Sequence, residues 1–317
     1  MEHDTTRQHG NEEPVSVRRK NQKKDYLTPA SILLASVILA AAWVYTTKLK
    51  VQPPATAQVA PNQTAVAIDE ATILPPEGVI LPVQWGDLGA QLVKSGVIDQ
   101  KKFAAIYAQR GGLNPDDQAL LAGTDNGALK ITPANSGLLL NLLWALGLAN
   151  KNDILEKGPM SDPQFGGAGG FAFTRGWTLA QGDAMNHFSR HRLLALTTDQ
   201  QDLVKRVAAN IYRPCCNNPT HFPDCNHGMA MLGLLELAAT QGVSEEAMYK
   251  MALQVNAFWF PDAYLSIAKY AAQQGVAWTA ANPKELLGAS FSSGSGYKQI
   301  LSQVTPVQSS GGGGCGV

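Results

Sequence analysis

The feature that most constrains this chain is one long apolar segment near its N-terminus, residues 27–47, which contains no charged side chain. A helix rises about 1.5 Å per residue, so a segment of this length covers the roughly 30 Å hydrocarbon core of a bilayer. A basic cluster precedes the segment, and the flank that follows has fewer basic residues. The positive-inside rule therefore places residues 1–26 in the cytoplasm and the rest of the chain outside.

We therefore predict a single-pass, signal-anchored protein of the cell membrane, with its main domain extracytoplasmic and the lipid bilayer as a partner through residues 27–47. A cleaved signal peptide is the alternative, because small residues at 40–42 resemble a cleavage site. The sequence does not name a protein partner.

Charge and composition exclude several other classes. The chain has 317 residues, and its 25 Lys and Arg balance its 25 Asp and Glu. A nucleic-acid binder needs a basic surplus to neutralise phosphates, so no nucleic-acid partner is expected. Four cysteines are too few for a dense disulfide scaffold, and a hydrophobic content of 45% is too high for a fully disordered chain.

Changes in composition divide the chain beyond the membrane segment into three regions. Residues 48–72 are rich in Pro, Ala, Gln and Thr and predict a flexible tether. Residues 73–289 carry the helix signals and predict one globular domain. Residues 290–317 are rich in Ser and Gly and predict a flexible tail.

Within residues 73–289 the signals predict a mostly α, indeed all-α, domain with orthogonal or antiparallel helices. A Thr-Pro pair predicts a helix start at residue 132, and a capping box of Thr198 and Gln201 predicts another. Helices are also expected over 226–240, 244–258 and 261–275, with the first of these at the centre of the domain. Three prolines make residues 73–85 irregular or at most a short edge strand.

Metal-ligating and redox-active side chains are concentrated between residues 187 and 227, which contain three of the four Cys and four of the six His. Most lie on a loop between two predicted helices. Thiolate and imidazole groups on one loop are suitable ligands for Zn, Cu or an Fe–S cluster. The predicted metal ligands on this loop are Cys215, Cys216, Cys225 and His227. The loop has no C-x-x-C pair, so the pattern is less specific than a standard zinc motif.

Two histidines before the loop, His187 and His191, are the predicted additional ligands. Together with Asp183 they are spaced four residues apart, and on a helix they would share one face. A solvent-exposed helix flank is the alternative, because Arg190 and Arg192 are their neighbours.

The cysteines have two further interpretations. Outside the cytoplasm thiols tend to be oxidised, so Cys225 paired with Cys215 or Cys216 would staple the loop. A free Cys225 just before a helix N-terminus would instead favour a thiolate and thiol redox exchange. Cys315, on the Gly-rich tail, is either a resolving thiol or metal shuttle, or an inert thiol.

The sequence therefore predicts a membrane-anchored helical protein that binds a transition metal or carries out thiol redox chemistry. One alternative is a non-catalytic interaction or scaffold domain with a disulfide-stapled loop. Another is an enzyme with a His base near the Gly- and aromatic-rich segment 165–177, whose aromatics are otherwise expected to pack inward. No catalytic residue is assigned.

Glu236, alone in an apolar helix, is expected in a salt bridge at the edge of the core, with a buried acid or base as the alternative.

Overall fold

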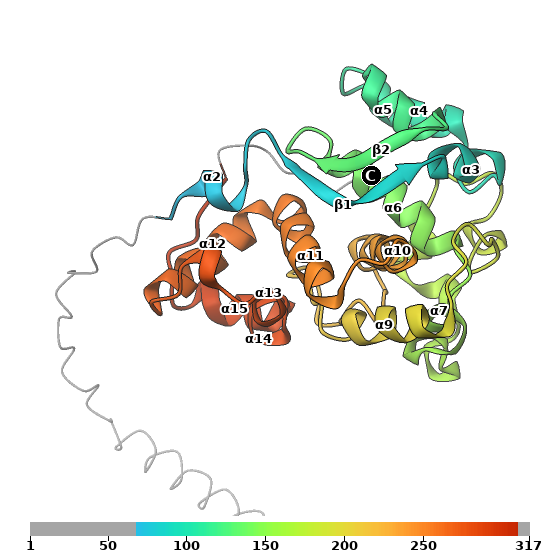
Figure 1. The fold of residues 1–317 in the computed structure, drawn as a ribbon. Helices are drawn as coiled ribbons and strands as arrows, with labels where there is room; N and C mark the ends of the chain where they lie inside the picture. Colours follow the sequence, from blue (N-terminus) through green and yellow to red (C-terminus); the bar gives the residue numbers. More distant parts are fainter. Residues whose placement is uncertain (1–67, 310–317) are drawn as a thin grey trace, which may run out of the picture. The chain divides into compact units, whose positions relative to one another are not determined.

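The computed structural model describes residues 68–309, which are mostly helical and contain one two-stranded sheet (Figure 1). The strands are β1 (Val79–Gly86) and β2 (Asn126–Ile131). The helices are, in chain order, α2 (Glu70–Ile73), α3 (Leu88–Lys94), α4 (Gln100–Ala108), α5 (Pro115–Ala122), α6 (Ser136–Ala149), α7 (Asp153–Lys157), α8 (Ala172–Arg175), α9 (Thr198–Ala208), α10 (Asn226–Thr240), α11 (Glu245–Trp259), α12 (Pro261–Gln273), α13 (Pro283–Leu286), α14 (Ala289–Ser292) and α15 (Gly294–Leu301).

The predicted membrane anchor lies outside the described residues. Within residues 68–309 no helix is long and apolar enough to cross a membrane. The segment 27–47, its basic flank, most of the predicted tether and Cys315 are all outside that range. The described part of the predicted tether is not extended throughout, because α2 begins at Glu70 and buries Ile73 against the core.

The centre of the domain is the pair of helices α6 and α10, which pack against each other (Figure 1). Every residue of α10 from His227 to Ala239 is buried, as the apolar residues on nearly all its faces predict. Glycines let the two backbones approach closely. A methyl group at Gly147 would overlap the carbonyl oxygen of Met229, and one at Gly233 would overlap that of Leu143. The prediction of a central helix over 226–240 is confirmed.

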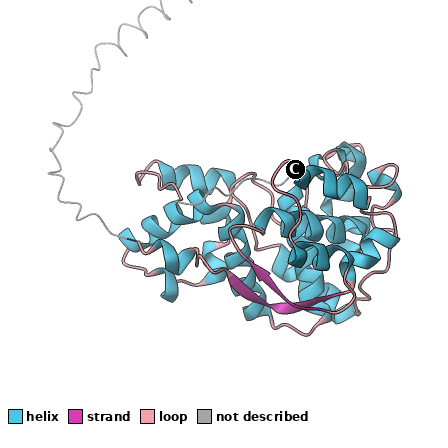
Figure 2. Cartoon of the chain, turned by 90° about the horizontal axis from the view of Figure 1, so that it is seen from above, coloured by secondary structure: helices cyan, strands magenta, loops and turns pink. Residues whose placement is uncertain are grey.

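The sheet corrects the prediction that the domain is all-α. Leu81, Val83 and Trp85 of β1 alternate inward, and the strand pairs antiparallel with β2 (Figure 2). The pairing register shifts between Ile80 and Gln84, so Pro82 sits where the ladder is interrupted and needs no N–H donor. That position explains how a proline-containing segment forms a strand of eight residues.

Residues 290–309 correct part of the predicted flexible tail, and residues 310–317 lie outside the described residues. Residues 289–301 form α14 and α15, and described structure continues to residue 309. Ser293 caps α15 by accepting from the backbone N–H of Gly296 at 3.0 Å. The N–H of Gly294 donates to the carbonyl oxygen of Cys216 at 2.7 Å. Serine and glycine here supply caps and close backbone contacts, which composition alone cannot distinguish from flexibility.

Helices α11 and α12 begin where the sequence predicts, whereas α9 and α6 begin at other residues than expected. Ser244 caps α11 and Pro261 opens α12, as predicted. The capping box of α9 lies one residue earlier than expected, on Thr197 and Gln200, which leaves the Gln201 side chain free to point elsewhere. Helix α6 begins at Ser136, after a turn that starts at Thr132.

Candidate functional site

The loop that joins α9 to α10 brings three cysteine sulfurs together. The Sγ atoms of Cys215, Cys216 and Cys225 all lie within 4.8 Å of one another, and the distance from Cys215 Sγ to Cys225 Sγ is 3.8 Å. All three are free thiols, so the predicted disulfide staple is not formed here. Cys225 is the N-cap of α10, and its sulfur accepts from the N–H of Gly228 at 3.4 Å.

A buried arginine, Arg213, holds this loop from the inside. Its side chain is only 1% exposed. It donates from Nε to the sulfur of Cys225 at 3.0 Å, from Nη1 to the carbonyl oxygen of Asn218 at 2.9 Å and from Nη2 to Asp224 at 2.7 Å. Gly228 makes room for it, because a methyl group there would overlap the guanidinium. Sequence reasoning missed Arg213, since a lone arginine before a proline carries no local signal.

The three thiols have different pKa values because they are hydrogen-bonded to one another. Hydrogen bonds from Cys215 and Cys216 hold the pKa of Cys225 well below that of an ordinary thiol, and Arg213 and a hydrogen bond from His227 act in the same direction against burial. Hydrogen bonds with Cys216 and Cys225, together with burial, raise the pKa of Cys215. The pKa of Cys216 is also raised, although its hydrogen bond with Cys215 acts downward. Cys225 is therefore the most acidic of the three thiols, in the direction that its place at a helix N-terminus predicts.

Of the predicted histidines, His227 lies beside the sulfurs. Its side chain hydrogen-bonds Cys225 and packs against Phe260, with ring centroids 4.3 Å apart. His227 is 3% exposed, so it contacts Cys225 from the protein interior, but like His187 and His191 it is not among the residues whose ligand atoms all lie within 4.8 Å of one another.

His187 and His191 form a pair of their own, and their nitrogens are not among the possible metal-ligand atoms that lie close to the sulfurs. His187 Nδ1 is 3.0 Å from His191 Nε2, and His187 Nε2 is 3.0 Å from the carbonyl oxygen of Gln181. They do not lie on a helix, which corrects the predicted stripe. Asp183 caps a short 3-10 turn, and Ser189, with φ at 52°, turns the chain before His191.

Glu236 is fully buried in α10 and has no ion-pair partner among residues 68–309, which corrects the prediction of a salt bridge at the core edge. Its carboxyl group accepts from the side-chain amides of Asn150, at 3.0 Å, and Asn152. Desolvation raises the pKa of Glu236 to about 8, although both amides act downward. It is therefore a neutral carboxyl group at physiological pH, held in a polar network.

The Gly- and aromatic-rich segment packs partly inward and partly against the cysteine loop. Phe173 and Trp177 are buried, as predicted. Phe165 is 43% exposed and meets Phe222, in the cysteine loop, with ring centroids 5.2 Å apart. The two segments therefore share an aromatic contact at the surface.

Comparison of the chain with known protein families, with curated proteins and with solved structures finds no match. Its class is defined by its own geometry: a mostly helical protein with a three-cysteine cluster near enough to bind a metal ion or to form a redox site.

Proposed function

We propose that the protein binds a single thiophilic transition-metal ion, Zn²⁺ or Cu⁺, through Cys215, Cys216 and Cys225. The convergence of the three sulfurs carries this proposal. Tetrahedral metal–thiolate bonds of about 2.3 Å place two sulfurs about 3.8 Å apart. The sulfurs of Cys215 and Cys225 are separated by 3.8 Å. An Fe–S cluster usually takes four cysteines, and the described cluster has three, which favours a single ion.

The surroundings of the sulfurs support metal binding. Arg213 donates to Cys225, which is the kind of outer contact that orients a ligand atom. It also offsets the charge of one thiolate, while Cys215 and Cys216 would release their protons when the metal binds. The fourth position is left to His227 or to a small exogenous ligand. His187 and His191, paired with each other, are not needed for this site.

A thiol redox function is the second candidate, and the unequal acidity of the thiols favours it. The Cys225 thiolate lies 3.8 Å from the sulfur of exposed Cys215. In an exchange with a disulfide substrate, one cysteine sulfur attacks the S–S bond, which forms a mixed disulfide and releases the first substrate sulfur as a thiol. The second cysteine sulfur then attacks the mixed disulfide and releases the other substrate sulfur. The substrate leaves as a dithiol with two protons and two electrons, and a Cys215–Cys225 disulfide remains.

We also propose that the site faces the extracytoplasmic side of a cell membrane. This proposal is supported by the sequence alone. The uncharged segment 27–47 and the basic residues before it indicate the orientation. In that compartment a bound metal would protect the thiols from oxidation.

Metal content and thiol content, measured together, test the first candidate. The full chain is purified anaerobically in mild detergent, analysed by inductively coupled plasma mass spectrometry and titrated with Co²⁺. We expect about one equivalent of Zn or Cu, thiolate-to-Co²⁺ absorption, and weaker binding as pH falls because each ligand must lose a proton.

Single substitutions identify the ligands. Cys225→Ser should abolish both the metal and the Co²⁺ absorption, whereas Cys315→Ser should leave affinity nearly intact. Less than about a tenth of an equivalent of any transition metal, with two loop cysteines already bridged, would overturn metal binding and favour the disulfide chemistry.

A further inference from the structure

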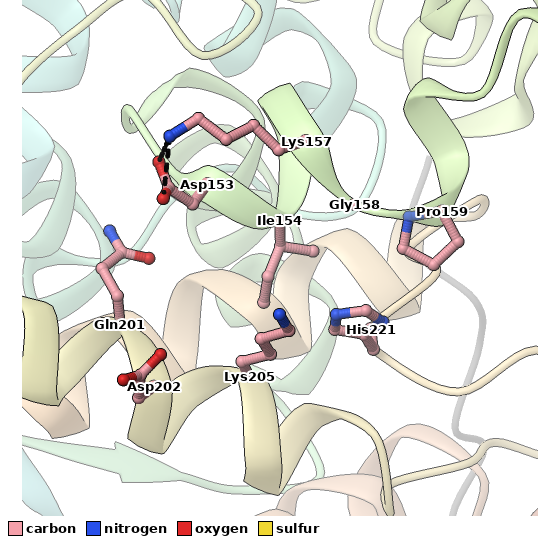
Figure 3. Close-up of a pocket in the computed structure, with 9 residues that line it drawn as sticks. All are labelled: Asp153, Ile154, Lys157, Gly158, Pro159, Gln201, Asp202, Lys205 and His221. Carbon is pink, nitrogen blue, oxygen red and sulfur yellow. Dashed lines mark hydrogen bonds and ion pairs between the residues drawn. The ribbon is translucent and has the colours of Figure 1, made fainter.

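A pocket that is separate from the cysteine cluster lies between α7 and α9 (Figure 3). Its volume is about 310 Å³, at the lower end for small-molecule sites. No cysteine lines it. Its polar lining side chains are Asp153, Lys157, Gln201, Asp202, Lys205 and His221.

Two oppositely charged side chains at the solvent-exposed edge of this lining have no ion-pair partner among the described residues. Lys157 pairs with Asp153 at 3.1 Å, so these two satisfy each other. Asp202 and Lys205 lie one turn apart on α9, and neither has an ion-pair partner among residues 68–309. The pocket therefore offers one free carboxylate and one free ammonium group to a ligand.

Two buried polar atoms of the lining also lack a hydrogen-bond partner in the described part of the chain, Oε1 of Gln201 and Nε2 of His221. Gln201 and His221 face the pocket from two different segments, α9 and the cysteine loop (Figure 3). A buried polar atom without a partner is energetically unfavourable, so such atoms are rare unless something else satisfies them. Burial and the nearby Lys205 lower the pKa of His221, which favours the neutral form of its ring.

We propose that this pocket binds a small zwitterion, such as a free amino acid, that carries one carboxylate and one ammonium group. The carboxylate pairs with Lys205, and the ammonium group pairs with Asp202 and donates to Oε1 of Gln201. Ile154 and Pro159 supply an apolar wall for a side chain. A simple anion would face the carboxylates of Asp153 and Asp202, and a simple cation would face two lysines. A ligand with both charges avoids either repulsion.

Calorimetric titration of the full chain with three probes of the same shape tests this inference. The probes are L-leucine, 4-methylpentanoate, which lacks the amino group, and 3-methylbutylamine, which lacks the carboxylate. We expect saturable binding of leucine with a dissociation constant of about 1 mM or lower. Each single-charge analogue should bind at least about tenfold more weakly, because it loses one charge-assisted contact.

Matched variants locate the site. Asp202→Asn and Lys205→Gln should each weaken leucine binding about tenfold or more. Asp199→Asn removes the same charge from the same helix outside the pocket and should leave binding unchanged. Circular dichroism and the thermal midpoint confirm that each variant is folded. Absence of leucine binding, equal binding of the analogues, or equal effects of Asp199→Asn and Asp202→Asn would overturn the proposal.

Discussion

Two buried ionisable side chains are accommodated in opposite ways. Arg213 keeps its charge because the thiolate of Cys225 and the carboxylate of Asp224 lie against it. Among the described residues Glu236 has hydrogen bonds from two side-chain amides and no cation to pair with, and it keeps its proton instead. The difference follows from the cost of burying an unpaired charge, which exceeds the cost of retaining a proton at neutral pH.

The buried carboxyl group predicts a pH-dependent stability. The unfolded chain releases the Glu236 proton above its usual pKa of 4.5, whereas the folded protein holds it until about 8. The folded state binds the extra proton in this window, so stability falls as pH rises, by a total on the order of 5 kcal/mol. Glu236→Gln should remove this contribution. Urea unfolding at pH 5, 7 and 9 measures it as the difference between the two proteins.

That difference isolates Glu236 from other titrating groups. Burial lowers the pKa of His191 and of His221, so these rings favour the folded state more as pH rises and partly mask the effect. They are the same in both proteins and cancel in the comparison. Parallel stability curves for the parent and Glu236→Gln would show that Glu236 ionises freely in the folded state.

At the scale of elements, the crossing of α6 and α10 depends on glycine. Gly147→Ala should destabilise the protein by about 2 kcal/mol or more, because the new methyl group overlaps the carbonyl oxygen of Met229 on the facing helix. Gly137→Ala is the matched control on the same helix, with nothing within 4 Å of the added methyl group. It should be neutral or slightly stabilising. Thermal and urea unfolding should separate the two variants, and equal behaviour would argue against a close crossing.

The elements that the sequence predicts well are those with local signals. Ser244 and Pro261 mark the starts of α11 and α12, and the apolar residues of α10 predict its burial. Strand β1 was obscured by prolines, because the register shift that accommodates Pro82 depends on a partner strand far along the chain. Helices α14 and α15 were obscured by Ser and Gly, whose caps and close contacts become visible only once the chain is folded.

In the candidate site too, some features could be predicted from local sequence signals and others could not. The proximity of three cysteines could be predicted from their concentration in one loop, and the thiolate at Cys225 from its place before a helix. The role of Arg213 could not be predicted, because its side chain reaches Cys225 and Asp224 only once the loop is folded. The i, i+4 spacing did pair His187 with His191, but through a turn at Ser189 and not along a helix.

At the scale of the whole molecule, the expected topology is a single membrane span with the helical domain outside the cytoplasm. The expectation rests on residues 27–47 and the basic residues before them. Protease added to intact cells should degrade the chain beyond residue 50 while a cytoplasmic marker protein survives. Protection of the domain in intact cells, with degradation after lysis, would contradict this topology.

The end of α10 has a consequence for how copies of the protein meet each other. The side chain of Gln241 accepts from the backbone N–H of Gln84 at 2.7 Å and donates to its carbonyl oxygen at 2.8 Å. An amide side chain thus stands where the backbone of a neighbouring strand would pair with β1. An open strand edge is a template for intermolecular β-pairing and aggregation, and Ile80 of the same strand is 69% exposed. By occupying this edge at Gln84, Gln241 takes one backbone position of β1 out of reach of a strand from another copy.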